Sequence, residues 1–173
     1  MNNNLLIVGA STYALVAYEI ALDMGCFGKI AFVDDAKKIG PNGVEVIATT
    51  KSMSDLACDY SNVVVAIGNP DIRLSLIHQI SQNEDFQIAT LISPKAYVSA
   101  SAKIMSGSII EPMAVVHSDC LISTGCIISA GAVINHASRC GDGVHLDCNS
   151  TVEGFCFVPA KTKLNAGTVY RTN

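Results

Sequence analysis

Apolar residues recur at every sixth position through the second half of the chain, beginning at Val98. The row runs without a slip through thirteen positions, namely Val98, Ile104, Ile110, Val116, Ile122, Ile128, Ile134, Cys140, Leu146, Val152, Val158, Leu164 and Tyr170. A helix needs a period near 3.6 and a plain strand a period of 2, so neither explains the row. A period of six is typical of the hexapeptide form of a parallel β-helix, in which short strands stack in three-sided coils.

Small residues and turn sequences repeat with the same period. Two places before each apolar position stands a small or β-branched residue, as in Ala96, Ala102 and Ser108, where crowding at a corner is expected. Glycine-containing turns such as Thr124-Gly125 separate the expected strands. Three hexads make one coil, so residues 18 apart should stack. A β-sandwich with an accidental period is the alternative, and thirteen successive positions in register argue against it.

The first half alternates strand and helix patterns. Strands are expected at 5–8, 29–33, 62–67 and 86–91, and helices at 12–24 and 71–81. Ile72 and Ile80 belong to the apolar face of the second helix. This alternation predicts a small parallel sheet of the Rossmann type. We therefore expect an α/β Rossmann-like domain over residues 1–93 and a parallel β-helix over residues 94–173.

Composition narrows the classes of partner. The chain has 173 residues, half of them hydrophobic, a formal net charge of −4 and a pI near 5.4. An acidic chain does not suit a nucleic-acid backbone. No apolar run approaches the roughly 20 residues of a membrane span, and the N-terminus lacks the basic segment of a signal peptide. The seven cysteines form no CxxC pair, which favours a reducing cytoplasm over a disulfide framework or metal cluster.

Polar clusters follow three of the expected strands. They are Gly9-Ala10-Ser11, Asp34-Asp35 and Gly68-Asn69. Ligands of such sheets bind at the carboxyl ends of the strands, and Ser11 with the next helix N-terminus suits a phosphate or hydroxyl. The full GxGxxG pattern is missing, so a mononucleotide moiety fits better than a dinucleotide. The alternative is that these clusters are ordinary turns without a ligand.

His136 is the candidate general base of the second half. It lies two places after the inward Ile134, so its side chain should project outward. A neutral imidazole suits the deprotonation of an amine or hydroxyl. A surface histidine without a role is the alternative, and the nearby His145 argues against it. His78 is expected on a helix surface, and His117 at a rim facing a ligand or a neighbouring subunit.

Taken together, these motifs resemble bacterial nucleotide-sugar acetyltransferases of the PglD/NeuD type, from Leu5 to about Gly154. The motifs are Gly9-Ala10-Ser11, Asp34-Asp35, Val65-Ala66-Ile67-Gly68-Asn69 with Arg73, Leu91-Ile92-Ser93-Pro94, Gly131-Ala132-Val133-Ile134-Asn135-His136 and Gly141-Asp142-Gly143-Val144-His145. The resemblance implies a homotrimer that needs no metal. It implies a Rossmann-like domain for the nucleotide sugar and a left-handed parallel β-helix that holds acetyl-CoA between subunits.

The resemblance also implies roles for individual residues. His136 matches the catalytic base, His145 a residue near the thioester, and Gly154 a glycine that contacts CoA. The implied substrate-binding residues are Ser11, Thr12 and Tyr13 on the sugar-nucleotide loop, the nucleobase pair Asp34 and Asp35, and Gly68.

Three features depart from the family pattern. Thr12-Tyr13-Ala14 replaces Gly-His-Gly, which suggests an altered sugar pocket. Ala137 replaces an acid that raises the basicity of the histidine. His136 is therefore expected to be a weaker base, or to be oriented by another group such as a backbone carbonyl or a carboxylate of the neighbouring subunit. Fewer coils follow the base than is usual in the family, which affects the distal CoA contacts.

The predicted function is N-acetylation of a UDP- or dTDP-linked 4-amino-4,6-dideoxy sugar by direct attack on acetyl-CoA. Two alternatives stay open from the sequence. One is O-acetylation of a sialic-acid-type sugar, and the other is a non-catalytic trimeric scaffold or ligand-binding protein.

Overall fold

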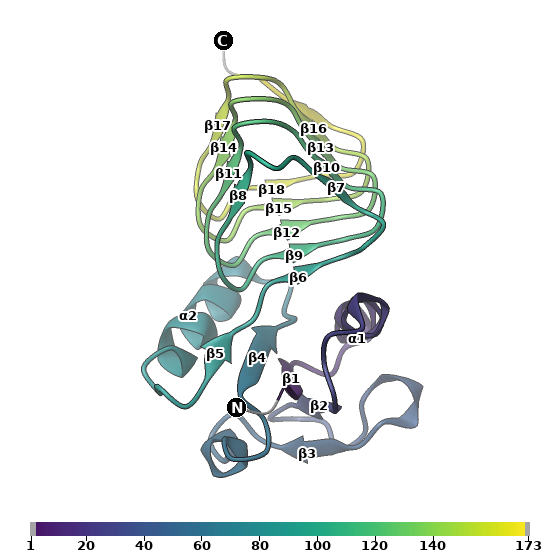
Figure 1. Cartoon of the computed structure of the whole chain (residues 1–173), viewed down its shortest axis with the longest axis vertical. Helices are drawn as coiled ribbons and strands as arrows, with labels where there is room; N and C mark the ends of the chain where they lie inside the picture. Colours follow the sequence, from purple (N-terminus) through teal and green to yellow (C-terminus); the bar gives the residue numbers. More distant parts are fainter. Residues whose placement is uncertain (1–2, 172–173) are drawn as a thin grey trace. The chain divides into compact units, whose positions relative to one another are not determined.

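The computed structural model describes residues 3–171, which divide into two compact units between Ala89 and Thr90. The first unit contains one parallel sheet with strand order β3-β2-β1-β4-β5 (Figure 1). Its strands are β1 (Leu5–Val8), β2 (Ile30–Val33), β3 (Val46–Ala48), β4 (Asn62–Val65) and β5 (Gln87–Ile88), and its helices are α1 (Thr12–Met24), α2 (Pro70–Ile80) and the 3-10 turns η1 (Pro41–Gly43) and η2 (Met53–Leu56). The predicted alternation of strands and helices is confirmed, and β3 was not predicted.

The central strands of this sheet are buried because both faces are covered. β1 is flanked by β2 and β4 in register, with Leu5 opposite both Ile30 and Asn62. All four residues of β1 are buried, as expected for a continuous apolar run in a parallel sheet. The order of connection reverses between β1 and β4, since the chain builds β2 and β3 on one side and then crosses to β4. Ligands of open parallel sheets bind at such a switch point.

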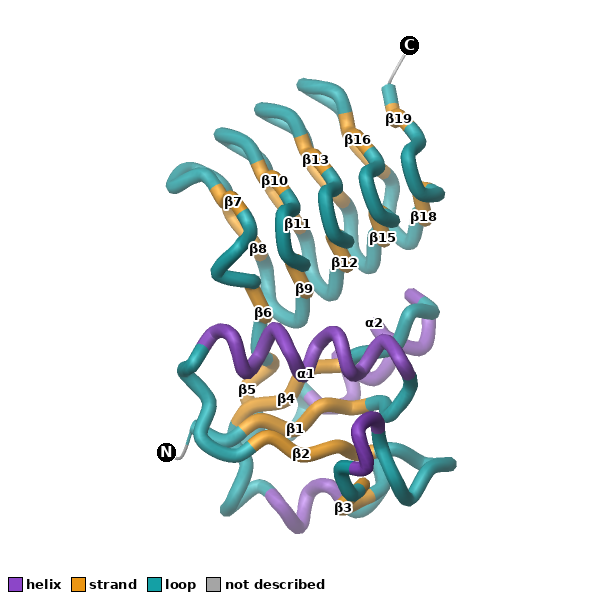
Figure 2. The backbone as a smooth tube through the Cα atoms, turned by 90° about the vertical axis from the view of Figure 1, so that its right-hand side faces the viewer, coloured by secondary structure: helices purple, strands orange, loops and turns teal. Residues whose placement is uncertain are grey.

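The second unit is a parallel β-helix built from two-residue strands. Three sheets form its sides (Figure 2): the β6 sheet (β6-β9-β12-β15-β18), the β7 sheet (β7-β10-β13-β16-β19) and the β8 sheet (β8-β11-β14-β17). The strands are β6 (Leu91–Ile92), β7 (Tyr97–Val98), β8 (Lys103–Ile104), β9 (Ile109–Ile110), β10 (Val115–Val116), β11 (Leu121–Ile122), β12 (Ile127–Ile128), β13 (Val133–Ile134), β14 (Arg139–Cys140), β15 (His145–Leu146), β16 (Thr151–Val152), β17 (Phe157–Val158), β18 (Lys163–Leu164) and β19 (Val169–Tyr170).

The predicted period of six is confirmed at every strand from β7 to β19. The second residue of each strand lies in or against the apolar core cluster, as Ile122, Ile134 and Val152 illustrate. Strands 18 residues apart pair, with Val116 opposite Ile134 and Ile134 opposite Val152. Each buried aliphatic side chain contributes roughly 1.5–3 kcal/mol, so the repeated row accounts for much of the stability of the coil.

The β-helix begins earlier than the predicted boundary at residue 93. The expected strand at 86–91 is two strands, because β5 pairs with β4 and β6 pairs with β9. Leu91 is paired with Ile109, so it already belongs to the first coil.

Every corner of the β-helix from residue 107 onward contains one residue with positive φ. These residues stand six apart and have φ between 56° and 74°: Gly107, Met113, Asp119, Gly125, Gly131, Ala137, Gly143, Asn149, Phe155, Lys161 and Gly167. Glycine, asparagine and aspartate adopt this left-handed conformation most readily, and other residues pay roughly 1–2 kcal/mol. The corner turn therefore explains why glycine recurs in the sequence, and it marks Met113, Ala137, Phe155 and Lys161 as exceptions.

Two buried corner serines differ in their hydrogen bonding. The Ser138 hydroxyl donates to the Glu153 carbonyl at 2.7 Å and accepts from the Cys156 N–H at 3.1 Å. The Ser150 hydroxyl has no hydrogen-bond partner among the described residues. Burying a hydroxyl that has no hydrogen-bond partner costs free energy, whereas a hydrogen bond offsets most of that cost for a buried hydroxyl that has a partner.

We expect Ser138→Ala to lower the free energy of unfolding by about 1–3 kcal/mol, because it leaves buried backbone groups unpaired. Ser150→Ala should leave stability unchanged or raise it by up to about 1 kcal/mol. Denaturant unfolding of both variants measures the difference. Equal losses for the two variants would contradict the hydrogen-bond explanation.

Candidate functional site

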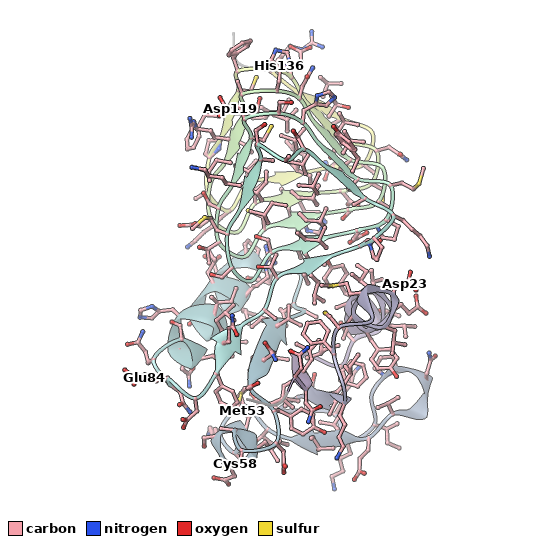
Figure 3. All side chains as sticks on the ribbon, viewed as in Figure 1. Asp23, Met53, Cys58, Glu84, Asp119 and His136 are labelled. Atoms are coloured by element: carbon pink, nitrogen blue, oxygen red, sulfur yellow. The ribbon has the colours of Figure 1, made fainter. Side chains whose placement is uncertain are left out.

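His136 lies on the turn between β13 and β14, and its side chain is exposed (Figure 3). Its backbone N–H donates to Asn135 Oδ1 at 2.8 Å, and its Nδ1 lies 2.8 Å from the same oxygen. The backbone N–H requires an acceptor, so the shared atom must be the amide oxygen. Nδ1 therefore carries the proton, and Nε2 keeps a lone pair that is available to a substrate.

Asn135 is thus the residue that orients His136, a role that the resemblance assigned to an acid at the position of Ala137. No hydrogen bond or ion pair joins His136 to a carboxylate among residues 3–171. The ring is oriented by a neutral amide rather than by a charge. The sequence contained this signal, since Asn135 is the adjacent residue.

Gly154 and Phe155 complete the surroundings of the imidazole. A Cβ at position 154 would lie 3.1 Å from His136 Cε1 and 3.3 Å from Nε2. The rings of Phe155 and His136 form a T-shaped pair, with centroids 5.0 Å apart and planes at 87°. Residue 154 is 18 residues after His136, so the stacking of coils brings them together. Gly154 leaves the side of the ring that bears the lone pair uncovered.

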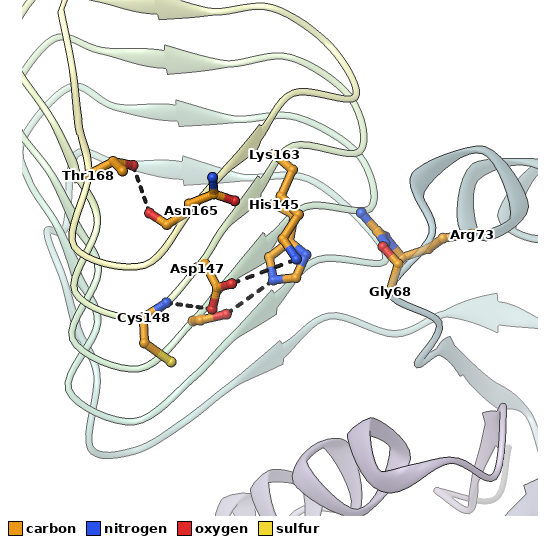
Figure 4. A network of polar contacts seen from close by, with 9 residues as sticks. Gly68, Arg73, His145, Asp147, Cys148, Lys163, Asn165 and Thr168 are labelled. Carbon is orange, nitrogen blue, oxygen red and sulfur yellow. Dashed lines mark hydrogen bonds and ion pairs between the residues drawn. The ribbon is translucent and has the colours of Figure 1, made fainter.

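His145 lies on another side of the β-helix. It is the first residue of β15 in the β6 sheet, whereas His136 stands at the corner between the β7 and β8 sheets. The His145 Nε2 is 3.4 Å from the Ser129 hydroxyl (Figure 4). Within one chain the two histidines are therefore not in contact.

The carboxylate of Asp147 belongs to the His145 cluster. Its pKa lies below the usual range because the Cys148 N–H donates to it, and His145 and Lys163 add favourable charge. The Lys163 ammonium is 3.7 Å from this carboxylate, and both side chains are partly exposed.

The loops after β1, β2 and β4 meet at the switch point of the first unit. Gly9 has φ of 107°, and a Cβ there would lie 3.1 Å from the Ala66 carbonyl oxygen, so only glycine allows this approach. Ser11 is the N-cap residue of α1, and its side chain makes no capping hydrogen bond. Ser11 and Thr12 are exposed and Tyr13 is half-buried.

The two aspartates after β2 already hold protein groups. Asp34 accepts from the N–H groups of Ala10, Ala36 and Lys37. Burial is the largest effect on its pKa and opposes ionisation, but these donors together with the Lys37 charge place the pKa below its ordinary value. Asp35 is exposed and accepts from both the N–H and the hydroxyl of Thr50. Asp34 therefore joins two loops, and of the pair Asp35 is the more accessible to a ligand.

Two cationic side chains at this edge were not predicted as site residues. The Lys37 ammonium donates to the Ala10 carbonyl at 2.8 Å, which places a positive charge beside the Gly9-Ala10-Ser11 loop. Arg73 is fully buried, and its Nη1 donates to the carbonyls of Ile67 at 2.7 Å and Gly68 at 2.8 Å (Figure 4). Arg73 fixes the loop that carries the predicted contact Gly68. Both roles depend on loop geometry that has no pattern in the sequence.

Asn69 has a structural role. Its side-chain oxygen accepts from the N–H groups of Asp71 and Ile72, which caps α2. The exposed Gly68 is the part of this cluster that stays available to a ligand.

An open hollow of about 500 Å³ lies on the outer face of the β8 sheet. Lys103 and Arg139 line it, together with Asp119 and Asp142. Arg139 follows His136 by three residues, so the hollow begins on the strand next to the base.

Among the described residues, no group of three or more His, Cys, Asp or Glu side chains is placed to hold a metal ion. Burial raises the pKa of the Cys120 and Cys140 thiols, which makes them poor nucleophiles. In the part of the chain that is described, neither helix has the length and apolar character to cross a membrane.

Comparison with known proteins finds one family model that matches part of the chain and several similar solved structures. Residues 4–80 match the family described as the PglD N-terminal domain, and no curated protein sequence matches the chain. The acetyltransferase domain of PglB from Neisseria gonorrhoeae is 25% identical, with a TM-score of 0.74 over 98% of this chain and 92% of that chain.

Two ligand complexes are also similar. The same PglB domain in complex with acetyl coenzyme A is 26% identical, with a TM-score of 0.67 over 98% of this chain and 88% of that chain. PerB from Caulobacter crescentus in complex with CoA and GDP-perosamine is 21% identical, with a TM-score of 0.77 over 97% of this chain and 88% of that chain. At that identity the PerB likeness establishes the fold alone.

Proposed function

We propose that this chain, which belongs to the bacterial sugar N-acetyltransferases of the hexapeptide-repeat family, acetylates the amino group of a nucleotide-linked 4-amino-4,6-dideoxy sugar. Acetyl-CoA is the donor. The observation that carries the proposal is the exposed His136, whose Nδ1–H is held by Asn135 and whose Nε2 lone pair is free for a substrate.

The reaction needs one base and no covalent intermediate. The amine nitrogen attacks the thioester carbon while Nε2 takes a proton from the amine. The tetrahedral intermediate then expels the thiolate of CoA, which recovers the proton from the imidazolium. Nδ1–H stays bonded to Asn135 throughout, so the ring keeps its orientation while Nε2 gains and loses the proton.

A Rossmann-like first unit is proposed to hold the nucleotide. This proposal is supported by three groups that lie at the switch point of the sheet, namely the Gly9-Ala10-Ser11 loop, Asp35 and Gly68. Lys37 brings a positive charge to the same edge, which suits the diphosphate. GDP joins UDP and dTDP as a candidate nucleotide because PerB was solved with GDP-perosamine.

A homotrimer of left-handed β-helices is proposed to complete the site. The first residues of the β7-sheet strands form an outward row of Tyr97, Val115, Val133, Thr151 and Val169. Tyr97 and Val169 are exposed, an apolar surface that suits contact with another copy. Since His145 and His136 lie on different sides, His145 would approach the thioester from a neighbouring subunit. The hollow with Lys103 and Arg139 would then take part of acetyl-CoA between subunits.

The test is an acetyl-transfer assay with three kinds of acceptor. Purified protein is incubated with acetyl-CoA and UDP- or dTDP-linked 4-amino-4,6-dideoxy sugars, GDP-perosamine or sialic acids, and mass spectrometry detects one added acetyl group. Acetylation of a sialic acid alone would support the O-acetyltransferase. Transfer to no acceptor, with no thermal shift from acetyl-CoA, would support a scaffold, since a ligand at 100 times its Kd should add about 2.7 kcal/mol.

Asn135 provides a prediction about pH. Asn135→Ala should lower kcat by up to about 10-fold. It removes the hydrogen bond that orients the imidazole, and such a bond contributes about 0.5–1.5 kcal/mol. Asn135→Asp keeps an acceptor but adds a negative charge, which favours the imidazolium and should move the pH–rate profile to higher pH. The matched control is Asn165→Ala, because Asn165 also follows an inward residue of the row. Unchanged pH profiles in both Asn135 variants would contradict the orienting role.

A further inference from the structure

Phe155 is a bulky, exposed aromatic residue at a corner position of the β-helix that suits smaller residues. Its φ is 59°, in the conformation that suits glycine, asparagine or aspartate. Its side chain is 76% exposed, the largest value among the exposed large apolar residues that the structure describes. It lies beside the base, with ring centroids 5.0 Å apart. A bulky residue at such a φ is strained, and strain of this kind concentrates at functional sites.

The position of the Phe155 ring beside His136 limits which part of the two substrates it can contact. During transfer the acceptor nitrogen must lie within about 3 Å of Nε2. The nitrogen also lies between the base and the thioester carbon, because it gives its proton to one and attacks the other. A side chain in contact with the imidazole is therefore closer to the acceptor than to the donor. The sugar ring that carries the amine is the part of the substrates within reach of Phe155.

We propose that Phe155 is a specificity residue that packs against the apolar, methyl-bearing face of the acceptor sugar. The inference rests on the proposed N-acetyltransferase function and adds the selection of deoxy sugars to it. An aromatic face binds C–H groups well and repels carboxylates, because the face of the ring is negative. A sugar with a methyl group at carbon 6 is therefore favoured over one with a hydroxyl there, and over a sialic acid.

The test compares two acceptors that differ only at carbon 6. They are a UDP-linked 4-amino-4,6-dideoxy sugar and the matching UDP-linked 4-amino-4-deoxy sugar, both with acetyl-CoA. The variant is Phe155→Asn, since asparagine adopts this φ at position 149 of the same fold. The control is Met113→Asn, because Met113 is also apolar, 70% exposed and at φ of 64°, but stands at a different corner, after β9.

For Phe155→Asn we expect kcat/KM for the deoxy sugar to fall about 10-fold. The preference for the deoxy sugar over its 6-hydroxyl counterpart should narrow by a similar factor. The KM for acetyl-CoA and the native mass should stay at wild-type values, and Met113→Asn should match the wild type in all four measurements.

Three results would overturn the inference. An unchanged preference between the two sugars would remove the specificity role. A loss confined to the KM for acetyl-CoA would place Phe155 against the donor, and an altered native mass would make it a subunit contact. If the wild type acetylates no acceptor, the proposed function itself fails, whereas an active wild type with an unchanged variant refutes the role of Phe155 alone.

Discussion

Replacing His136 with glutamine is expected to lower kcat by about 10²–10⁴-fold, the range that a positioned general base contributes. Glutamine is polar and close in size, but it offers no basic nitrogen where Nε2 stands. The substrates are held mainly by other residues, so both KM values should change little. Steady-state kinetics with acetyl-CoA and the best acceptor measure the effect.

The control for this variant is His78→Gln. His78 is exposed on α2 in the first unit and belongs to none of the candidate sites, so its replacement should leave kcat unchanged. Turnover by His136→Gln within a few-fold of the wild type would exclude the imidazole as the base. The proton would then leave the amine through water or another side chain.

Gly154→Ala is expected to lower kcat by about 10²-fold although it adds a single methyl group. The new Cβ would stand 3.1 Å from Cε1 and 3.3 Å from Nε2 of His136, closer than ordinary contact. The imidazole has to shift by a few tenths of an ångström while Asn135 holds Nδ1. The methyl group also covers part of the side of the ring that bears the lone pair, which keeps the acceptor nitrogen away from Nε2. A displacement of about 1 Å in a catalytic group can cost 10²-fold in rate.

The backbone at position 154 should itself tolerate alanine. The equivalent place, two residues after an inward residue, is occupied by Ala130, Ala160 and Ala166 in other hexads. The free energy of unfolding of Gly154→Ala should therefore stay within about 1 kcal/mol of the wild type. Ala166→Gly is the reverse control and should keep full activity. A fully active Gly154→Ala would show that the imidazole has room to adjust.

The amino-acid sequence alone determined the β-helix. Inward positions must be apolar, and the residues two places before them are small or β-branched. This repeat gives the sequence a period of six that chance does not produce. The same period also predicts which residues of the candidate site lie against each other. His136 and Gly154 are 18 residues apart, so stacking of successive coils places one against the other. The alternation of strands and helices in the first unit and the polar clusters at its strand ends also followed from the sequence, whereas β3 and the order of the strands did not.

Only the tertiary structure decided what each polar group binds. Asp34 and Asn69 were candidates for a ligand, but the Asp34 carboxylate accepts the Ala10 N–H of a neighbouring loop, and the Asn69 oxygen accepts N–H groups of the first turn of α2. Ile72 was expected inside and is exposed, while Arg73 is buried because its guanidinium binds two carbonyls. Periodicity reports which face of an element is covered. It does not report which donors lie within hydrogen-bond distance, because those distances depend on loops whose geometry is set by the packed fold.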